Sequence, residues 1–149
     1  MLLLAFAAAS GAMTPMAERV VTLAALNKRS GRSETFTAKP GEQVSFDALT
    51  VRVRACEKTA SWEAEQYTGA FLQLDVLGTD DKWRRIFSGW TFRERPGLNV
   101  VQHPIYDVWV KSCTMAFPAV GPDTVVAGRA PKTGSSAKKS PVAARAPSN

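Results

Sequence analysis

The chain has 149 residues, a usual length for a single domain. Its formal charge of +6 is concentrated near the C-terminus, where residues 120–149 hold five bases and one acid. The rest of the chain is close to neutral, so charge alone gives no indication of a nucleic-acid-binding protein.

The N-terminal residues are typical of a secretory signal peptide. Residues 2–9 are an apolar run, too short to span a bilayer, for which about 20 residues are needed. Ser10, Gly11 and Ala12 supply the small residues of a cleavage site. We therefore expect residues 1–17 to be a signal peptide with flanking residues, and the mature chain to be periplasmic with no integral membrane segment. The signal is atypical, or starts upstream, because no base precedes the apolar run; the alternative is a buried first strand or helix.

Two cysteines, Cys56 and Cys113, predict a disulfide if the chain is exported. In a cytosolic protein they would be two unrelated buried thiols. Their spacing matches no metal or redox motif. A bridge closing a loop of this size stabilises a fold by about 4 kcal/mol in the loop-entropy model.

Alternating apolar and polar residues predict about seven short strands and no sustained helix. In chain order, the expected strands fall within residues 19–26, 33–38, 44–46, 49–56, 70–76, 83–92 and 105–113. Turn clusters rich in Gly, Pro and Asp separate most of them, and residues 57–69 form a polar loop. The fold class is therefore all-β, a small antiparallel β-sandwich or barrel over residues 18–118.

Residues 119–149 contain Ala, Pro, Gly, Ser and Lys but no aromatic residue. Such a segment buries too little apolar surface to offset its ordering entropy, so we expect a disordered basic tail. It is either a solvated extension or a tether to anionic polymers of the envelope.

Strand alternation also predicts where the cysteines point. Cys56 falls on the side of its strand that carries Arg52 and Arg54, and Cys113 falls on the side that carries Trp109. Both cysteines would then lie on the face opposite the main core. Trp109 would lie near the two arginines.

Aromatic residues gather in the C-terminal half of the expected domain. Gly89 lies among them, and a glycine between large rings can let a ligand or second chain approach the backbone. Most of the rings would serve the core, but some would be left for binding. The candidate binding residues are Trp90, Phe92, Asn99, His103, Tyr106 and Trp109. The expected partner is an envelope protein or a wall polymer.

The enzymatic alternative is a small hydrolase with Ser88 as nucleophile, His103 as base and Asp107 as orienting residue. Ser88 lies inside an expected strand, whereas a catalytic serine needs a sharp turn and an oxyanion hole. The sequence holds no cofactor motif, and His103 is its single histidine, so no metal site is expected. We therefore expect a binding or assembly module without enzymatic activity.

Several motifs carry a family resemblance: Phe87-Ser88-Gly89-Trp90-Thr91-Phe92, Pro96-Gly97-Leu98-Asn99, His103-Pro104-Ile105-Tyr106-Asp107-Val108-Trp109-Val110 with Cys113, Leu26-Asn27-Lys28-x-x-Gly31-Arg32 and Val51-Arg52-Val53-Arg54-Ala55-Cys56. With them, residues 20–113 resemble an uncharacterised family of small exported proteins of Gram-negative bacteria, classed as a domain of unknown function. The resemblance implies export and a Cys56–Cys113 pair. It implies no activity, because none has been assigned to the family.

Overall fold

A computed structural model describes residues 12–118 of the chain. The apolar run of the expected signal peptide, within residues 1–11, and the basic tail over 119–149 lie outside the described residues.

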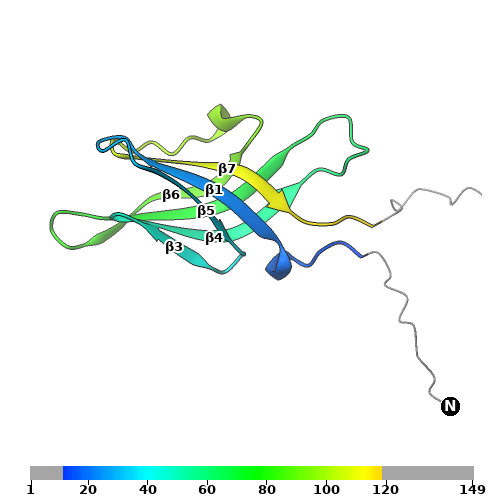
Figure 1. Ribbon diagram of the computed structural model, residues 1–149, viewed down its shortest axis with the longest axis horizontal. Coiled ribbons are helices and arrows are strands. Elements are labelled where there is room, and N and C mark those ends of the chain that lie inside the picture. Colours follow the sequence, from blue (N-terminus) through cyan, green and yellow to red (C-terminus); the bar gives the residue numbers. More distant parts are fainter. Residues whose placement is uncertain (1–11, 119–149) are drawn as a thin grey trace, which may run out of the picture. The chain divides into compact units, whose positions relative to one another are not determined.

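The described residues form seven strands in two antiparallel sheets (Figure 1). One sheet has the order β2-β1-β7 and the other has the order β3-β4-β5-β6. The strands are β1 (Val20–Asn27), β2 (Ser33–Ala38), β3 (Gln43–Phe46), β4 (Leu49–Lys58), β5 (Thr68–Leu77), β6 (Trp83–Phe92) and β7 (Tyr106–Thr114). Two short 3-10 helices, η1 (Met16–Glu18) and η2 (Pro96–Leu98), complete the domain. The expected all-β sandwich is confirmed.

The hydrophobic core lies between the two sheets, because each strand turns alternate apolar side chains inward. Fully buried members come from both sheets, among them Val21, Leu23, Val51, Leu72 and Leu74. Within the described range, no helix is long and apolar enough to cross a membrane.

The expected position of the cysteines is wrong, and β-bulges are the reason. The register between β4 and β5 shifts between Val53 and Ala55, and the register between β1 and β7 shifts where Lys111 has no partner. Each extra residue reverses the alternation that follows it. Cys56 and Cys113 therefore turn into the core, where both are almost fully buried.

The disulfide between Cys56 and Cys113 joins β4 of one sheet to β7 of the other, with 5.9 Å between the two Cα atoms. Beside it, the buried Arg19 donates hydrogen bonds to the Cys56 carbonyl at 2.8 Å and the Thr14 carbonyl at 3.0 Å. Arg19 also forms an ion pair with Glu57 at 2.5 Å. This end of the sandwich is therefore held by one covalent bond and one charged network.

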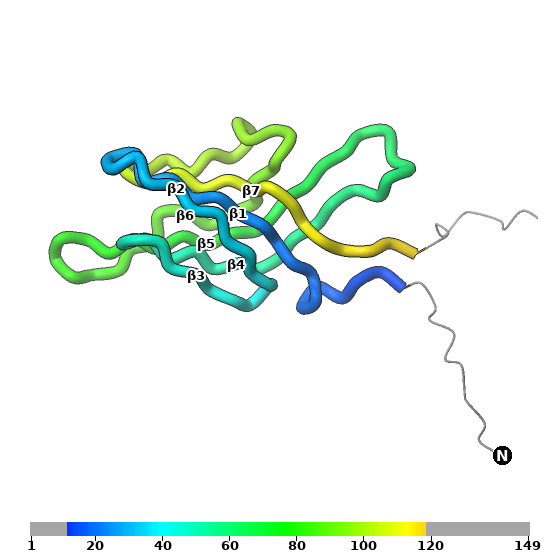
Figure 2. Tube along the Cα trace, in the orientation of Figure 1, coloured from blue at the N-terminus to red at the C-terminus, as the bar shows by residue number. Residues whose placement is uncertain are grey.

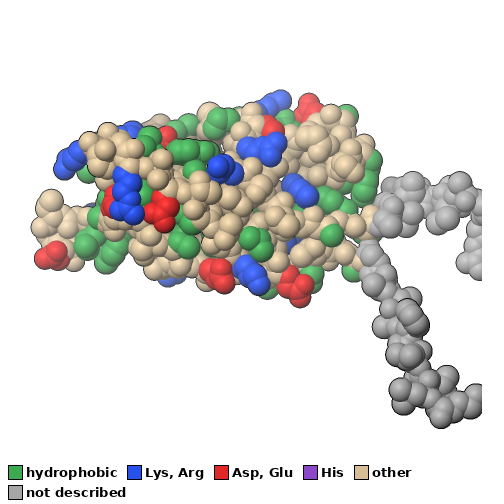
Figure 3. Space-filling model, viewed as in Figure 1, with side chains coloured by type: hydrophobic (Ala, Val, Ile, Leu, Met, Phe, Trp, Pro, Cys, Tyr) green, Lys and Arg blue, Asp and Glu red, His purple; other side chains and the backbone are tan. Residues whose placement is uncertain are grey.

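Charge is mixed on the surface of the domain. On the face that Figure 3 shows, acidic and basic side chains alternate without forming a patch of one sign. Apart from Arg19 with Glu57, the ion pairs among the described residues join two partly exposed side chains, such as Arg85 with Asp75 and Arg32 with Asp47. Such pairs contribute little to stability individually.

Candidate functional site

The connection from β6 to β7, residues 93–105, is anchored at its start to β5. The Arg93 N–H donates to the Thr68 carbonyl at 2.9 Å, and the Thr68 N–H donates to Glu94 at 2.7 Å. The Arg95 guanidinium lies over the Tyr67 ring, 5.2 Å from its centroid. These contacts fix the direction in which the chain leaves the sheet.

The middle of this connection is held against β6 by Asn99. Its side-chain amide donates to the Trp90 carbonyl at 2.9 Å. A Cβ atom on Gly89 would lie 2.6 Å from that amide nitrogen, so the glycine makes room for Asn99. The space beside Gly89, expected to admit a ligand, is therefore filled by the chain's own side chain. Val101 then enters the core.

A groove of about 400 Å³ lies between this connection and β7; it is lined by residues 91–93, 96–97, 99–101 and 107–110. Figure 2 shows the connection returning along β7. The volume is within the range of ligand pockets, about 300–1,000 Å³. Exposed apolar side chains, Leu98, Val100 and Trp109, stand on or beside its walls.

Strand β7 is an edge strand, and its middle has open backbone groups along the groove. The Asn27 N–H donates to the Arg32 carbonyl, so the backbone groups of Asn27 face β2. Those of the preceding residue, Leu26, therefore face β7, where Leu26 pairs with Asp107. Because alternate residues of an antiparallel strand face opposite edges, the N–H and C=O of Val108 and Val110 face away from β1. Within residues 12–118 these groups take part in no hydrogen bond outside strand pairing.

Both ends of this open edge are closed by side chains. At the start of β7, the Tyr106 N–H donates to His103 Nδ1 at 3.1 Å. Towards its end, the Arg93 guanidinium donates to the Lys111 carbonyl at 3.4 Å. The open part of the edge is therefore Val108–Val110.

Two polar side chains of the groove lack partners. The Thr91 hydroxyl is buried and has no hydrogen-bond partner among the described residues. An unsatisfied buried hydroxyl costs about 1–3 kcal/mol. The half-buried Asp107 carboxylate forms no hydrogen bond or ion pair with any residue in the range 12–118. The groove thus combines apolar walls with unpaired donors and acceptors.

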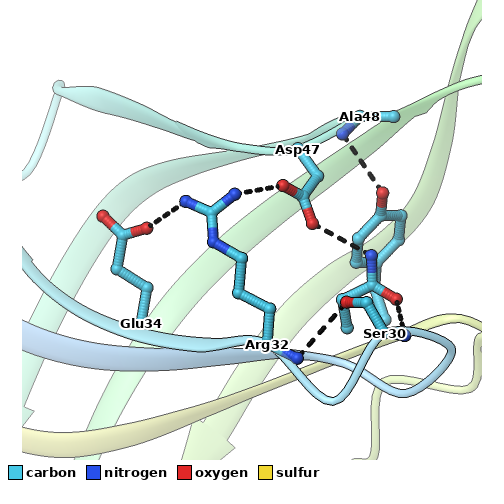
Figure 4. Close-up of polar contacts among 7 residues, drawn as sticks. Ser30, Arg32, Glu34, Asp47 and Ala48 are labelled. Carbon is cyan, nitrogen blue, oxygen red and sulfur yellow. Dashed lines mark hydrogen bonds and ion pairs between the residues drawn. The ribbon is translucent and has the colours of Figure 1, made fainter.

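In a second polar site, the turn cluster, the polar side chains have hydrogen-bond partners (Figure 4). It consists of Asn27, Arg32, Asp47 and Tyr106. Asp47 accepts hydrogen bonds from Asn27 at 2.9 Å and from Arg32 at 2.6 Å. The buried Tyr106 hydroxyl accepts from the Ala48 N–H at 3.1 Å. These contacts join the β1–β2 turn to the β3–β4 turn, and so one sheet to the other.

His103 supports the turn cluster. Its ring stacks on Tyr106, with 5.6 Å between the centroids, and its Nδ1 accepts hydrogen bonds from the Ile105 and Tyr106 N–H groups. Its carbonyl accepts from the Lys28 ammonium. Burial, and then the Lys28 charge, lower the His103 pKa. Both effects favour the neutral ring, in which Nδ1 can accept these hydrogen bonds.

The structure brings only some of the candidate binding residues together. Asn99 and Trp109 line the groove. Phe92 also borders it, but its ring lies on the outer face of β6, edge-on to Tyr67 with 6.4 Å between ring centroids. Trp90 is on the outer face of β6, edge-on to Phe71 with 5.8 Å between ring centroids. His103 and Tyr106 belong to the turn cluster.

Trp109 does not lie near the arginines of β4, as strand alternation had suggested. Arg52 is on the outer face of the four-stranded sheet, where it donates to Gln43 at 2.9 Å. Trp109 is on the outer side of β7 in the three-stranded sheet, where it pairs with Ala24 of β1. The two residues therefore belong to opposite faces of the sandwich.

Ser88, His103 and Asp107, the residues of the hydrolase alternative, lie in different parts of the domain. Ser88 is on the outer face of β6 and accepts a hydrogen bond from Gln73 at 3.4 Å. His103 Nδ1 is occupied by backbone donors, and Asp107 lines the groove. Within residues 12–118, no hydrogen bond joins any two of the three. The same residues hold no group of three or more His, Cys, Asp or Glu side chains suited to a metal ion.

Sequence reasoning missed the edge residues Val108 and Val110, and also Thr91. Whether a strand lies at an edge depends on sheet order, which alternation does not reveal. The sequence gives a weak indication of Thr91, because this residue lies between two aromatic residues and shares the inward face of β6 with Gly89.

Comparison with known proteins places the chain among bacterial proteins of unassigned function. A protein called "Uncharacterized protein RP359", from Rickettsia prowazekii (strain Madrid E), is 27% identical over 90 residues. The match covers 60% of this chain and 57% of the relative, so the chain spans little more than half of that protein's length. No solved structure matches the chain. A family model described as "Uncharacterized protein conserved in bacteria (DUF2155)" matches residues 21–113, from β1 to the second cysteine. The chain therefore belongs to the DUF2155 family.

Proposed function

We propose that the chain is a non-enzymatic binding or assembly module of the bacterial envelope. It works in the periplasm and holds its partner in the groove beside β7. The observation that carries the proposal is the groove itself. It places the exposed Trp109, the unpaired Asp107 and the buried Thr91 hydroxyl beside an open strand edge. Exposed aromatic side chains are common anchors of binding surfaces, and polar groups placed beside them orient the partner.

The disulfide supports export, and the contacts of Thr14 are compatible with it. The buried disulfide is of a kind that persists in oxidising compartments. The Thr14 N–H donates to the Ala116 carbonyl at 3.1 Å, and the Thr14 hydroxyl accepts from the Ala116 N–H at 2.8 Å. Cleavage after Ala12 would leave both hydrogen bonds in the mature domain.

Affinity capture from an envelope extract tests the binding role. We expect the wild type to retain a partner that Trp109→Ala loses. Trp83→Ala is the matched control, because Trp83 is also exposed but lies on the β5–β6 hairpin, outside the groove lining. Equal recovery by all three proteins would refute the assignment of the groove.

Cell fractionation with thiol counting tests the compartment. We expect the chain in the periplasmic fraction, with no thiol accessible to a maleimide after denaturation. A cytosolic chain with both thiols free would refute export.

A further inference from the structure

We infer that the groove takes an extended peptide segment, which pairs with Val108–Val110 as an added strand and places a lysine or arginine beside Asp107. This inference rests on the proposed binding function and names the partner's chemical class.

The open edge of β7 calls for a peptide backbone. The outward N–H and C=O groups of Val108 and Val110 are two residues apart, which is the spacing at which an extended peptide presents its own pairs. Peptides are commonly recognised in this way at sheet edges. An alkyl chain would leave these groups unpaired, at a cost in free energy.

The groove also restricts the length of the added strand. His103 Nδ1 occupies the Tyr106 N–H, and Arg93 covers the Lys111 carbonyl. Pairing is therefore confined to Val108–Val110, and the rest of the segment must leave the edge on both sides.

The side chains of the groove specify the peptide further. Apolar walls, including Val100 and Val101, suit an apolar side chain of the peptide. The buried Thr91 hydroxyl suits a carbonyl at the floor, because a carbonyl can accept its hydrogen bond. The Asp107 carboxylate, at the rim and without a partner, complements a basic side chain.

A library of short capped peptides, measured by fluorescence anisotropy against the full chain, tests the inference. We expect the selected peptides to carry alternating apolar residues with one basic residue. A single N-methyl group should weaken binding by about tenfold or more at every second amide and have little effect at those between. Uniform tolerance of N-methylation, or no peptide bound, would overturn the inference.

Three variants sharpen this test. Asp107→Asn should remove the preference for a basic residue, whereas Glu63→Gln, the same change in charge on an exposed loop, should retain it. Thr91→Val should weaken peptide binding without destabilising the fold, because it removes an unsatisfied hydroxyl at constant shape. A basic preference that survives Asp107→Asn would overturn the charge assignment.

Other occupants would be recognised in the same assay. Concentration-dependent self-association that peptides compete away would assign the groove to a second copy. Peptide binding that appears only after residues 119–149 are removed would assign it to the chain's own tail. Either result overturns the inference. If no peptide binds but Trp109→Ala still loses its envelope partner, strand addition fails while the proposed function stands.

Discussion

The turn cluster and the groove both border β7, but they differ in whether their polar groups have hydrogen-bond partners. In the turn cluster, Asp47 accepts two side-chain hydrogen bonds and the Tyr106 hydroxyl satisfies a backbone N–H. In the groove, Thr91 and Asp107 have no partner among the described residues. A satisfied polar network stabilises a fold, whereas an unsatisfied one costs free energy that a ligand can recover. Around β7, polar residues that support the fold can thus be told apart from those that we propose to bind a partner.

Strand β7 itself shows the same contrast along its length. Tyr106 fixes its start to the turn cluster, and Cys113 fixes its end through the disulfide. Between these two points, Val108–Val110 faces the groove. We interpret the fixed ends as the support that keeps the open middle in place.

The largest expected effect comes from breaking one fixed end. Replacing both Cys56 and Cys113 with Ala should lower the free energy of unfolding by about 4 kcal/mol, because the bridge closes a long loop. Urea unfolding measures the loss. As a control, a reductant should destabilise the wild type and leave the double variant unchanged. A loss below about 1 kcal/mol would show that the bridge contributes little to the support.

A smaller effect is expected at the other fixed end. Tyr106→Phe should cost about 1–2 kcal/mol, because the Ala48 N–H loses its partner inside the sandwich. Tyr67→Phe is the control; that hydroxyl bonds Glu65 at the exposed surface, so no measurable change in urea unfolding is expected. Equal effects in the two variants would contradict a special role for the turn cluster.

The turn cluster should also give a pH dependence. The His103 pKa is lowered in the folded chain, so the unfolded chain binds a proton more readily as the pH falls. Stability from this residue is therefore complete above the unfolded pKa, near 6.5, and is lost as the pH falls towards the folded pKa. Urea unfolding at a series of pH values should show a shallower decline for His103→Gln. An unchanged slope would refute this role.

The smallest effect on stability is expected in the groove. Asp107→Asn should change the free energy of unfolding by no more than about 0.5 kcal/mol, because the carboxylate has no partner to lose. The measurement is urea unfolding at neutral pH. A clear loss of stability would mean that Asp107 supports the fold, as Asp47 does in the turn cluster.

Much of the fold was predictable from the sequence, because strand alternation is a local signal. Its period located the seven strands, and the cysteine count anticipated the bridge. The faces of the strand ends were not predictable. A bulge at Lys111, and another between Val53 and Ala55, reverse the alternation without a distinctive residue pattern. A third, at Ile86, does the same in β6.

The candidate site was predictable only in part, for a different reason. The density of aromatic and turn residues drew attention to Asn99 and Trp109, which line one groove, and to Phe92, which borders it with its ring on the outer face of β6. The same reasoning also selected His103 and Tyr106, because a stacked structural pair has the same composition as a binding pair. Sheet order, which decides that β7 is an edge, is a non-local property.

Amide hydrogen exchange along β7 tests the open edge most directly. We expect exchange rates to alternate: Asp107 and Trp109 are protected by pairing with β1, while Val108 and Val110 exchange much faster because their N–H groups face the groove. Uniformly slow exchange from Asp107 to Val110 would show that the edge is already paired, and would contradict an open edge at Val108–Val110.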